Sequence, residues 1–295
     1  MKLSGVIGYL VTPFVDGFIN EPVLRLMVNR LIASGVHGLS PLGSTGESAY
    51  LNDEEWEVVA RVTVEECRGR VPVVIGASAL TTRKAVNLAQ KAKALGADAV
   101  MVAPLSYWKL REQEVFGHYA AISEAVDLPI MVYNNPATCG IDLSPELLVK
   151  LIRQLEHPFA IKESSGDIQR MHRIQELSGG EIPFFNGCNP LALEALCAGA
   201  SGWCTAAPNL IARDNLMLWD CVQQGDLKAA RDVFYRQLPL LRFILKGGLP
   251  ATVKSGLSLQ GIDAGVPRLP LLPLDPDGTQ ALAALLASVS PFEEA

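Results

Sequence analysis

Short apolar runs alternate with longer amphipathic segments along the first 225 residues of the chain. Most of these runs are rich in branched apolar side chains with no regular polar alternation, which is typical of strands buried on both faces. Each run is followed by a segment with the 3.6-residue period of a helix. The expected strands are 5–12, 38–42, 71–77, 99–103, 129–134, 159–163, 184–187 and 202–205; the expected helices are 21–34, 53–68, 81–95, 112–126, 144–154, 167–177, 190–198 and 212–224.

Eight strand–helix units predict a closed parallel barrel of the (β/α)8 type, the TIM barrel, with its helices outside. Three helix starts support these boundaries: Asn52 with Glu55 forms a capping pattern, and Ser144 and Asn189 each precede a proline at the expected first helical position. An open doubly wound sheet would alternate in the same way. The absence of a Gly-x-Gly-x-x-Gly turn after the first strand argues against it.

Residues after 225 do not continue the alternation. Helices are expected over 226–246, 252–259 and 279–287, and prolines recur at 267, 270, 273 and 276 between the last two. Recurrent proline disfavours both helix and central strand, so this stretch should be an extended, polyproline-like connector on the surface. We therefore expect residues 1–225 to form the barrel and residues 226–295 to form a helical extension of the same domain.

Composition narrows the class of protein. The net charge of −6 and the lack of a basic cluster argue against nucleic-acid binding. No apolar stretch is long enough to span a membrane, and the first apolar run is broken by Gly8 and Pro13, which favours a buried strand over a signal peptide. Six cysteines without Cys-x-x-Cys pairs indicate reduced thiols and a cytoplasmic protein. The four histidines show no metal-ligand spacing, so we expect no metal site.

The first candidate for chemistry is the turn Gly43–Ser48, which follows the second expected strand. In a barrel of this type the active site lies where strands end and the following loops begin. Two glycines and three hydroxyl residues can turn backbone N–H groups and the Ser44 and Thr45 hydroxyls toward a carboxylate. The sequence leaves open a simpler interpretation, in which the turn only caps the next helix.

Tyr133 and Lys162 end two neighbouring strands. A tyrosine there can act as a general acid or base, or can simply line the barrel. Removal from water favours the neutral form of a lysine amine, which can attack a ketone to form an imine, an electron sink for bond cleavage. The alternatives are a lysine that extends to solvent or one paired with Glu163. Because adjacent strands lie about 4.8 Å apart, both side chains can project into one mouth.

An amine, a phenol and a carboxylate-binding turn together indicate a Schiff-base site for a 2-oxo acid. The set Gly43–Ser48, Tyr133–Pro136 and Lys162–Ser164, in this order and spacing, resembles the dihydrodipicolinate synthase/N-acetylneuraminate lyase family of class I pyruvate aldolases. The similarity runs over nearly the whole chain, from Val11–Phe14 to Arg268–Pro270.

The resemblance implies a (β/α)8 barrel with a helical extension, assembled as a homo-oligomer, often a tetramer built from dimers. It implies that Lys162 forms the Schiff base, that Tyr133 shuttles protons, and that Ser44 and Thr45 bind the carboxylate and relay protons. It requires no cofactor beyond this covalent imine. It also suggests that Tyr107, in the loop after the fourth strand, enters the site of a neighbouring subunit.

One position departs from the synthase branch of the family, which carries an arginine shortly after the Tyr-Asn-x-Pro motif. Here that place is held by Thr138, and a neutral hydroxyl cannot replace a bidentate guanidinium on a second carboxylate. Trp203, ending the eighth strand, could add bulk to the same pocket or simply pack the barrel.

We therefore expect a Schiff-base lyase, an aldolase or dehydratase, that acts on pyruvate or a 2-keto-3-deoxy acid. The alternative within this class is 4-hydroxy-tetrahydrodipicolinate synthase, which condenses pyruvate with aspartate semialdehyde. The alternative from a different class is a non-catalytic barrel that binds 2-oxo acids. A pure binder has no need of Lys162, Tyr133 and Thr45 together, which argues against it.

Overall fold

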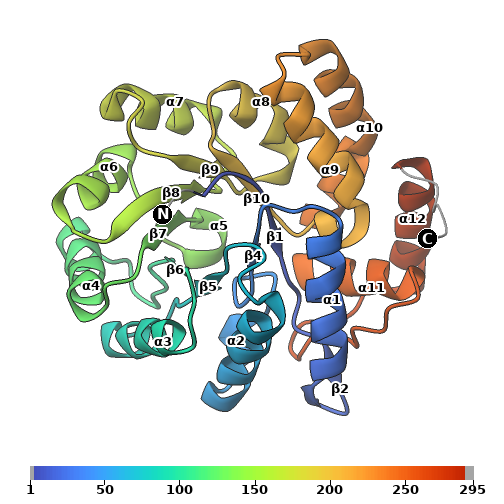
Figure 1. Cartoon of the computed structure of the whole chain (residues 1–295), viewed down its shortest axis with the longest axis horizontal. Helices are drawn as coiled ribbons and strands as arrows, with labels where there is room; N and C mark the ends of the chain where they lie inside the picture. Colours follow the sequence, from blue (N-terminus) through green and yellow to red (C-terminus); the bar gives the residue numbers. More distant parts are fainter. Residues whose placement is uncertain (1–2, 290–295) are drawn as a thin grey trace.

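The computed structural model describes residues 3–289, and within this range a ring of eight parallel strands lies inside a ring of helices (Figure 1). The prediction of a TIM barrel is therefore confirmed. The strands of the barrel are β1 (Gly5–Tyr9), β4 (Gly38–Ser40), β5 (Val74–Gly76), β6 (Ala99–Val102), β7 (Ile130–Asn134), β8 (Pro158–Glu163), β9 (Phe184–Asn186) and β10 (Gly202–Thr205).

The strands follow the order β4-β1-β10-β9-β8-β7-β6-β5, and the sheet closes between β4 and β5. A parallel bridge joins Leu39 to Val73, and the Gly76 N–H donates to the Pro41 carbonyl at 3.1 Å. A Cβ atom on Gly76 would lie 1.9 Å from the Leu42 carbonyl oxygen. Only glycine allows this approach, so Gly76 is needed where the barrel closes.

The outer helices cover the barrel through their apolar faces. Asn52 forms the expected capping box with Glu55, and Ser144 caps its helix as expected. The expected cap at Asn189 is wrong, because the short 3-10 helix begins at Asn189 itself and the amide of this residue points into the core. The helices are α1 (Glu21–Ala33), α2 (Asp53–Cys67), α3 (Thr82–Ala94), α4 (Glu112–Ala125), α6 (Pro145–Gln154), α7 (Ile168–Ser178), α8 (Ala192–Cys197) and α9 (Pro208–Gln223).

Two small elements were not expected from the sequence. Strands β2 (Phe14–Val15) and β3 (Phe18–Ile19) form an antiparallel hairpin after β1, with Asp16 and Gly17 at φ angles of 51° and 83°. An Asp-Gly pair suits a tight hairpin turn in which both residues have positive φ. Strands of two residues are too short to give a periodic signal, so only the turn dipeptide could have predicted them.

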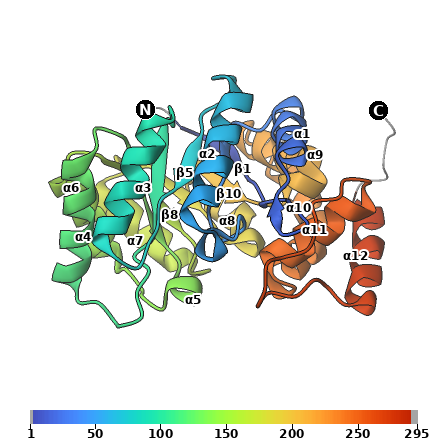
Figure 2. The same cartoon turned by 90° about the horizontal axis from the view of Figure 1, so that it is seen from below.

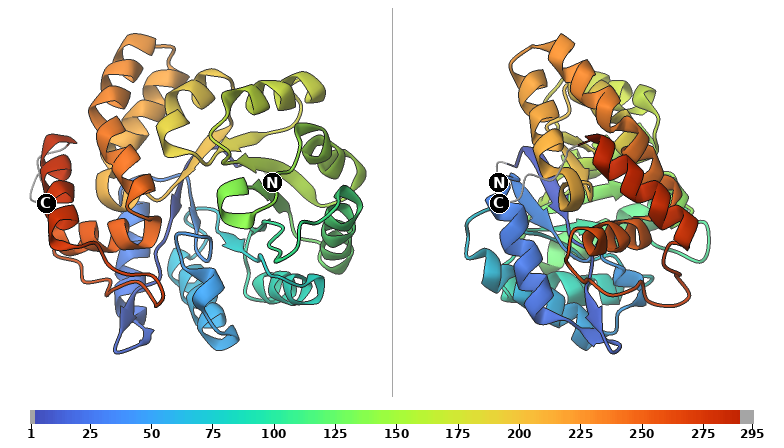
Figure 3. Two further views of the ribbon diagram at one scale, coloured as in Figure 1. Left: turned by 180° about the vertical axis from the view of Figure 1, so that it is seen from behind. Right: turned by 90° about the vertical axis from the view of Figure 1, so that its right-hand side faces the viewer.

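The C-terminal extension packs on one side of the barrel, next to α1 and α9 (Figures 1 and 3). Figure 2 shows α12 as the helix farthest from the barrel strands. The segment from 260 to 275 contains neither helix nor strand, as expected for the connector. Residues 290–295 of the expected extension lie outside the described part of the chain. The helices of the extension are α10 (Leu227–Lys246), α11 (Leu249–Leu259) and α12 (Pro276–Val289).

Helices α9, α11 and α12 each begin three or four residues before the predicted start. In all three the early turn contains a proline, at 208, 250 and 276. Proline lacks a backbone N–H, and the recurrent prolines from 267 to 276 therefore predict irregular structure up to residue 276. The first turn of a helix leaves its N–H groups unpaired in any case, so proline is well tolerated there.

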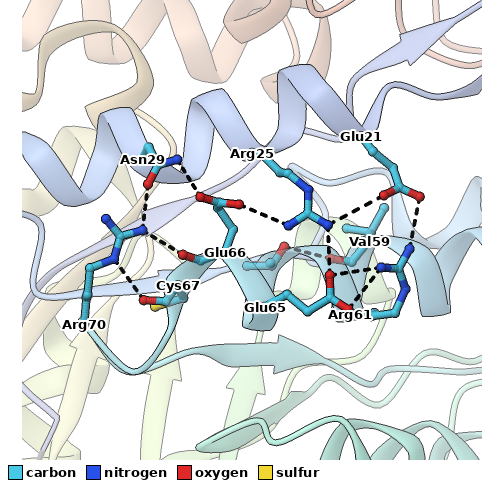
Figure 4. A network of polar contacts seen from close by, with 10 residues as sticks. Glu21, Arg25, Asn29, Val59, Arg61, Glu65, Glu66, Cys67 and Arg70 are labelled. Carbon is cyan, nitrogen blue, oxygen red and sulfur yellow. Dashed lines mark hydrogen bonds and ion pairs between the residues drawn. The ribbon is translucent and has the colours of Figure 1, made fainter.

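A surface network of charges joins α1 to α2 (Figure 4). Arg25 donates to Glu65 at 2.8 Å and to Glu66 at 3.0 Å, and Arg61 donates to Glu21 at 3.0 Å. Exposed pairs of this kind are worth only about 0–1 kcal/mol each. The network thus fixes the first two helices to each other modestly, and its side chains take no part in the cavity described next. No helix within residues 3–289 has the length and apolar character required to cross a bilayer.

Candidate active site

A cavity of about 230 Å³ opens at the carboxyl ends of the barrel strands. Its walls come from the loops after β1, β4, β7, β8, β9 and β10 and from α10 and α11 of the extension. Ser44, Thr45, Tyr133 and Lys162, selected from the sequence, therefore meet in one place. The lining residues are Tyr9, Ser44, Thr45, Tyr133, Asn135, Ala137, Thr138, Lys162, Ser164, Ser165, Gly187, Cys188, Asn189, Cys204, Thr205, Ala206, Leu245 and Leu249.

Lys162 lies in the floor of this cavity. It is 5% exposed, and it is paired in the β7–β8 register with Tyr133. Its Nζ atom lies 4.0 Å from the ring centre of Tyr9, 3.9 Å from that of Tyr133 and 3.8 Å from the Met101 sulfur. Two aromatic faces stabilise positive charge at this nitrogen without neutralising it. The same two faces can therefore stabilise a cationic imine formed there.

Glu163 does not pair with Lys162, so the pairing considered in the sequence analysis is wrong. The Glu163 carboxylate accepts hydrogen bonds from Asn134 Nδ2 at 3.0 Å, from the Ser165 N–H at 2.7 Å and from Arg170 Nε at 3.3 Å. Successive side chains of a strand point to opposite faces, which directs the carboxylate away from the amine. Among residues 3–289, no carboxylate forms an ion pair with Lys162.

Tyr133 carries its hydroxyl into the cavity with a defined hydrogen-bond role. Asn135 Nδ2 donates to the phenolic oxygen at 2.7 Å, while Asn135 Oδ1 accepts the Thr138 N–H at 3.3 Å as the N-cap of the short helix α5 (Pro136–Cys139). Because the phenolic oxygen already accepts a bond, its own hydrogen is available for donation to a bound molecule. The Tyr-Asn-Asn-Pro motif therefore contains both a proton donor, the Tyr133 hydroxyl, and the asparagine that fixes its position.

The turn after β4 holds Ser44 and Thr45 at the cavity wall. The turn is closed by hydrogen bonds from the Gly46 N–H to the Gly43 carbonyl at 3.0 Å and from the Glu47 N–H to the Ser44 carbonyl at 3.2 Å. It does not cap the next long helix, since Asn52 does so. The Ser44 and Thr45 side chains therefore lie where the predicted carboxylate site requires them, at the wall of the cavity.

Three other residues selected from the sequence lie in different settings. Thr138 lies at the rim of the cavity. Tyr107 is 91% exposed, stacks edge-on against Trp108 and does not reach the cavity of its own chain. Trp203 also lies outside the lining: it is fully buried and donates its indole N–H to Asn189 at 3.3 Å. Cys204 and Thr205, nearer the end of β10, line the cavity in its place.

Tyr9, Asn135 and Ser164 are site residues that the sequence analysis did not assign to roles. Tyr9 ends β1, but the first strand was expected to run to residue 12, which placed Tyr9 in its middle. Ser164 Oγ is buried with no hydrogen-bond partner in the described part of the chain. Burial raises the pKa of the Tyr9 phenol well above its usual value, so Tyr9 stays protonated and is a poor general base.

No group of three or more histidine, cysteine, aspartate or glutamate side chains with metal-binding geometry is found between residues 3 and 289. The cavity wall carries one charged side chain, Lys162, among the residues that the structure describes. Burial raises the pKa of the Cys188 and Cys204 thiols, the two that line the cavity, so neither ionises readily near neutral pH. The nucleophile that the geometry favours is therefore the amine.

Comparison with known proteins agrees with this geometry. The model of the Dihydrodipicolinate synthetase family matches residues 2–289. The 4-hydroxy-tetrahydrodipicolinate synthase of Methanopyrus kandleri is 36% identical over 272 residues, which cover 92% of this chain and 91% of that protein.

Solved structures are similar over the same length. A protein of Pseudomonas aeruginosa, provisionally assigned as a dihydrodipicolinate synthetase, is 53% identical with a TM-score of 0.97, covering 98% of this chain and 100% of its own. The chloride-inhibited dihydrodipicolinate synthase of Acinetobacter baumannii, solved with pyruvate, is 28% identical with a TM-score of 0.93, covering 98% and 99%. The chain therefore belongs to the dihydrodipicolinate synthetase family and is a lyase of the class I aldolase type, in which a lysine forms the Schiff base.

Proposed function

We propose that this lyase forms and breaks a carbon–carbon bond next to the ketone of pyruvate through Lys162. The amine adds to the ketone carbon and water leaves, which gives an iminium. Loss of a methyl proton gives an enamine, whose carbon attacks an aldehyde, and water then releases the product. The observation that carries the proposal is a buried lysine between two aromatic rings, with no carboxylate partner among residues 3–289, in a cavity that Ser44 and Thr45 also line.

The remaining roles follow from the same cavity. Ser44 and Thr45 would bind the pyruvyl carboxylate and relay protons, and Tyr133 would exchange protons with the reacting carbons and oxygens. The pyruvate complex of the Acinetobacter baumannii relative supports the choice of ketone. The non-catalytic alternative, a 2-oxo-acid sensor, is disfavoured because the chain keeps both the amine and its proton donor.

The experiment is reduction with borohydride in the presence of pyruvate, which makes the imine permanent. We expect a single adduct, located on Lys162 by mass spectrometry of the digested protein. An adduct on another lysine, or none at saturating pyruvate, contradicts the proposed mechanism. An adduct without turnover of any aldehyde or 2-keto-3-deoxy acid would instead favour the sensor.

Two aldehyde partners have specific support. The names of the curated relatives favour 4-hydroxy-tetrahydrodipicolinate synthase, the alternative from the sequence, and hence aspartate semialdehyde. The charge of the cavity favours a neutral aldehyde, whose aldol product with pyruvate is a 2-keto-3-deoxy acid, because none of the described residues lining the cavity near Thr138 offers a cation for a second carboxylate. Arg111 in the loop after β6 pairs with Glu114 at 2.8 Å instead of lining the cavity.

Replacing Thr138 by arginine is expected to raise kcat/KM for aspartate semialdehyde. A hydrogen bond to a charged group is worth about 1.5–3 kcal/mol, against about 0.5–1.5 for a neutral one. The difference of about 1–2 kcal/mol corresponds to a gain of roughly five- to thirtyfold. Condensation with pyruvate is measured for wild type, Thr138→Arg and the uncharged Thr138→Gln. Efficient wild-type condensation at micromolar aldehyde would contradict the neutral-partner hypothesis and establish the synthase.

We also propose that the chain works as a homo-oligomer, a dimer or tetramer, in the cytoplasm. Tyr107 and Trp108 form an aromatic pair that is 91% and 77% exposed, and contact with a second copy would remove it from water. In such an assembly Tyr107 would approach the neighbouring cavity, as the resemblance implies. The six free cysteines support a reducing compartment.

Chelators are expected to leave turnover unchanged, since we propose that the Lys162 imine is the only electron sink that the reaction uses. Initial rates are compared with and without EDTA, after dialysis and after addition of zinc. A loss on chelation that zinc restores would favour a metal-dependent aldolase.

A further inference from the structure

A buried ion pair lies directly behind the carboxylate-binding turn. The Glu47 carboxylate lies 2.6 Å from Lys254 Nζ, and the two side chains are 0% and 2% exposed. Glu47 belongs to the Gly43–Ser48 turn, whereas Lys254 belongs to α11 of the C-terminal extension. Lys254 also donates to the Val266 carbonyl at 3.1 Å and lies over the Phe14 ring at 4.2 Å. The pair therefore joins the active-site turn to the extension.

The backbone of Glu47 is held as tightly as its side chain. Its φ angle is 56°, in the left-handed region that a residue other than glycine rarely adopts. Its second carboxylate oxygen accepts the Arg268 N–H from the connector at 2.7 Å. Its own N–H donates to the Ser44 carbonyl at 3.2 Å. A displacement of Glu47 would therefore move Ser44 directly.

A buried ion pair is a costly way to hold a loop. Desolvation of both charges often outweighs their attraction, and well-packed apolar residues would frequently be as stable. What the charges of Glu47 and Lys254 add is a fixed geometry. Glu47 Oε1 lies against the Lys254 ammonium while Oε2 accepts the connector N–H, and Lys254 donates to the Val266 carbonyl. Stability alone does not account for this pair.

We propose that Glu47 is a positioning residue for the pyruvyl carboxylate, and that the C-terminal extension sets 2-oxo-acid affinity through Lys254. This inference rests on the proposed function, in which Ser44 and Thr45 bind that carboxylate. Glu47 touches neither substrate nor the reacting atoms. It acts by holding the turn in the conformation that presents N–H and hydroxyl groups to the anion.

The test compares two ketones that form the same imine, pyruvate with a carboxylate and acetone without one. Borohydride trapping is measured against ketone concentration for wild type, Glu47→Gln, Lys254→Met and the double variant. We expect the half-saturating pyruvate concentration to rise about tenfold or more in Glu47→Gln, since small displacements of a binding group are costly. The trapping rate at saturating pyruvate should stay near the wild-type rate, the mark of lost binding alone. Trapping of acetone should not change.

Asp214→Asn is the matched control, because it removes a buried carboxylate that pairs with Arg236 at 2.7 Å outside the cavity. Its half-saturating pyruvate concentration should equal that of wild type. If a single variant unfolds, the uncharged double variant avoids leaving one buried charge alone and carries the test. Equal loss of pyruvate and acetone trapping, or no loss in folded variants, overturns the positioning role. A wild-type protein that traps no pyruvate overturns both this inference and the proposed function.

Discussion

Turnover and the borohydride-trapped adduct are both expected to disappear when Lys162 is replaced by methionine. Methionine keeps most of the unbranched stem that packs between Tyr9 and Tyr133 but has no nucleophile. Loss of a covalent nucleophile removes the whole pathway, so kcat/KM should fall by a factor on the order of 10⁴ or more. The measurement is steady-state kinetics with the best aldehyde partner, together with mass spectrometry after reduction.

The same variant is expected to fold at least as well as the wild type. Burying a charged amine costs several kcal/mol, and the two rings return only about 2 kcal/mol in a desolvated site. Lys162→Met removes that cost without leaving a carboxylate unpaired, because Glu163 bonds elsewhere. Thermal unfolding checks this result, and a large drop in Tm would show that the amine is structural.

Lys150→Met is the control for these measurements. Lys150 also lies over an aromatic ring, that of Phe116 at 5.3 Å, but it is on an outer helix and pairs with Glu112 at 3.1 Å. Its replacement should leave kinetics and adduct unchanged. Substantial residual turnover in Lys162→Met, with Lys150→Met normal, would mean that another group forms the intermediate.

The barrel was predictable from the sequence because its signals are local and repeated. Most buried strands are short apolar runs, most outer helices carry a helical period, and some helix starts carry a cap, as at Asn52 and Ser144. Elements without such repetition were missed. The hairpin at Phe14–Ile19 has strands of only two residues. The first turns of α11 and α12 contain prolines, which in a sequence indicate a loop as readily as the start of a helix.

The site residues could be predicted where a chemically reactive side chain lies at the end of a strand. Lys162 and Tyr133 satisfy that rule, and the register of β7 with β8 brings them together. Tyr9 was missed because a one-dimensional pattern does not show that β1 stops three residues before the apolar run does. Trp203 was assigned to the pocket by the same rule, although its indole packs below the cavity. A hydrophobic pattern does not define the residue at which a strand ends, and the residues of this site are the ones at the strand ends.

The link between Glu47 and Lys254 could not be found by reading along the chain. An acidic residue in a glycine-rich turn and a lysine in an apolar helix each have common surface interpretations when taken alone. Their pairing requires knowing that α11 packs over the carboxyl end of the barrel. Contacts between the barrel and its extension join residues that are far apart in the sequence, so no short sequence pattern predicts them.

Tyr133→Phe is expected to keep the Lys162 adduct but to lose turnover by a factor on the order of 10²–10⁴, the usual contribution of a general acid or base. Phenylalanine preserves the ring beside the amine nitrogen, so the cationic imine keeps its stabilisation. The lost hydroxyl is the group that Asn135 supports at 2.7 Å and whose hydrogen is free for donation. Single-turnover kinetics should show slowed proton transfer with pyruvate binding preserved.

Tyr119→Phe is the matched control, because it removes another buried phenol, one that donates to the Val102 carbonyl at 2.7 Å and does not line the cavity. It should lower the free energy of unfolding by about 0.5–1.5 kcal/mol, the usual contribution of one intramolecular hydrogen bond, without changing kcat. Equal effects of the two variants on kcat would mean that the loss in Tyr133→Phe arises from altered packing. Normal turnover in Tyr133→Phe would assign proton transfer to another group, for which the cavity offers the hydroxyls of Thr45 and Ser164.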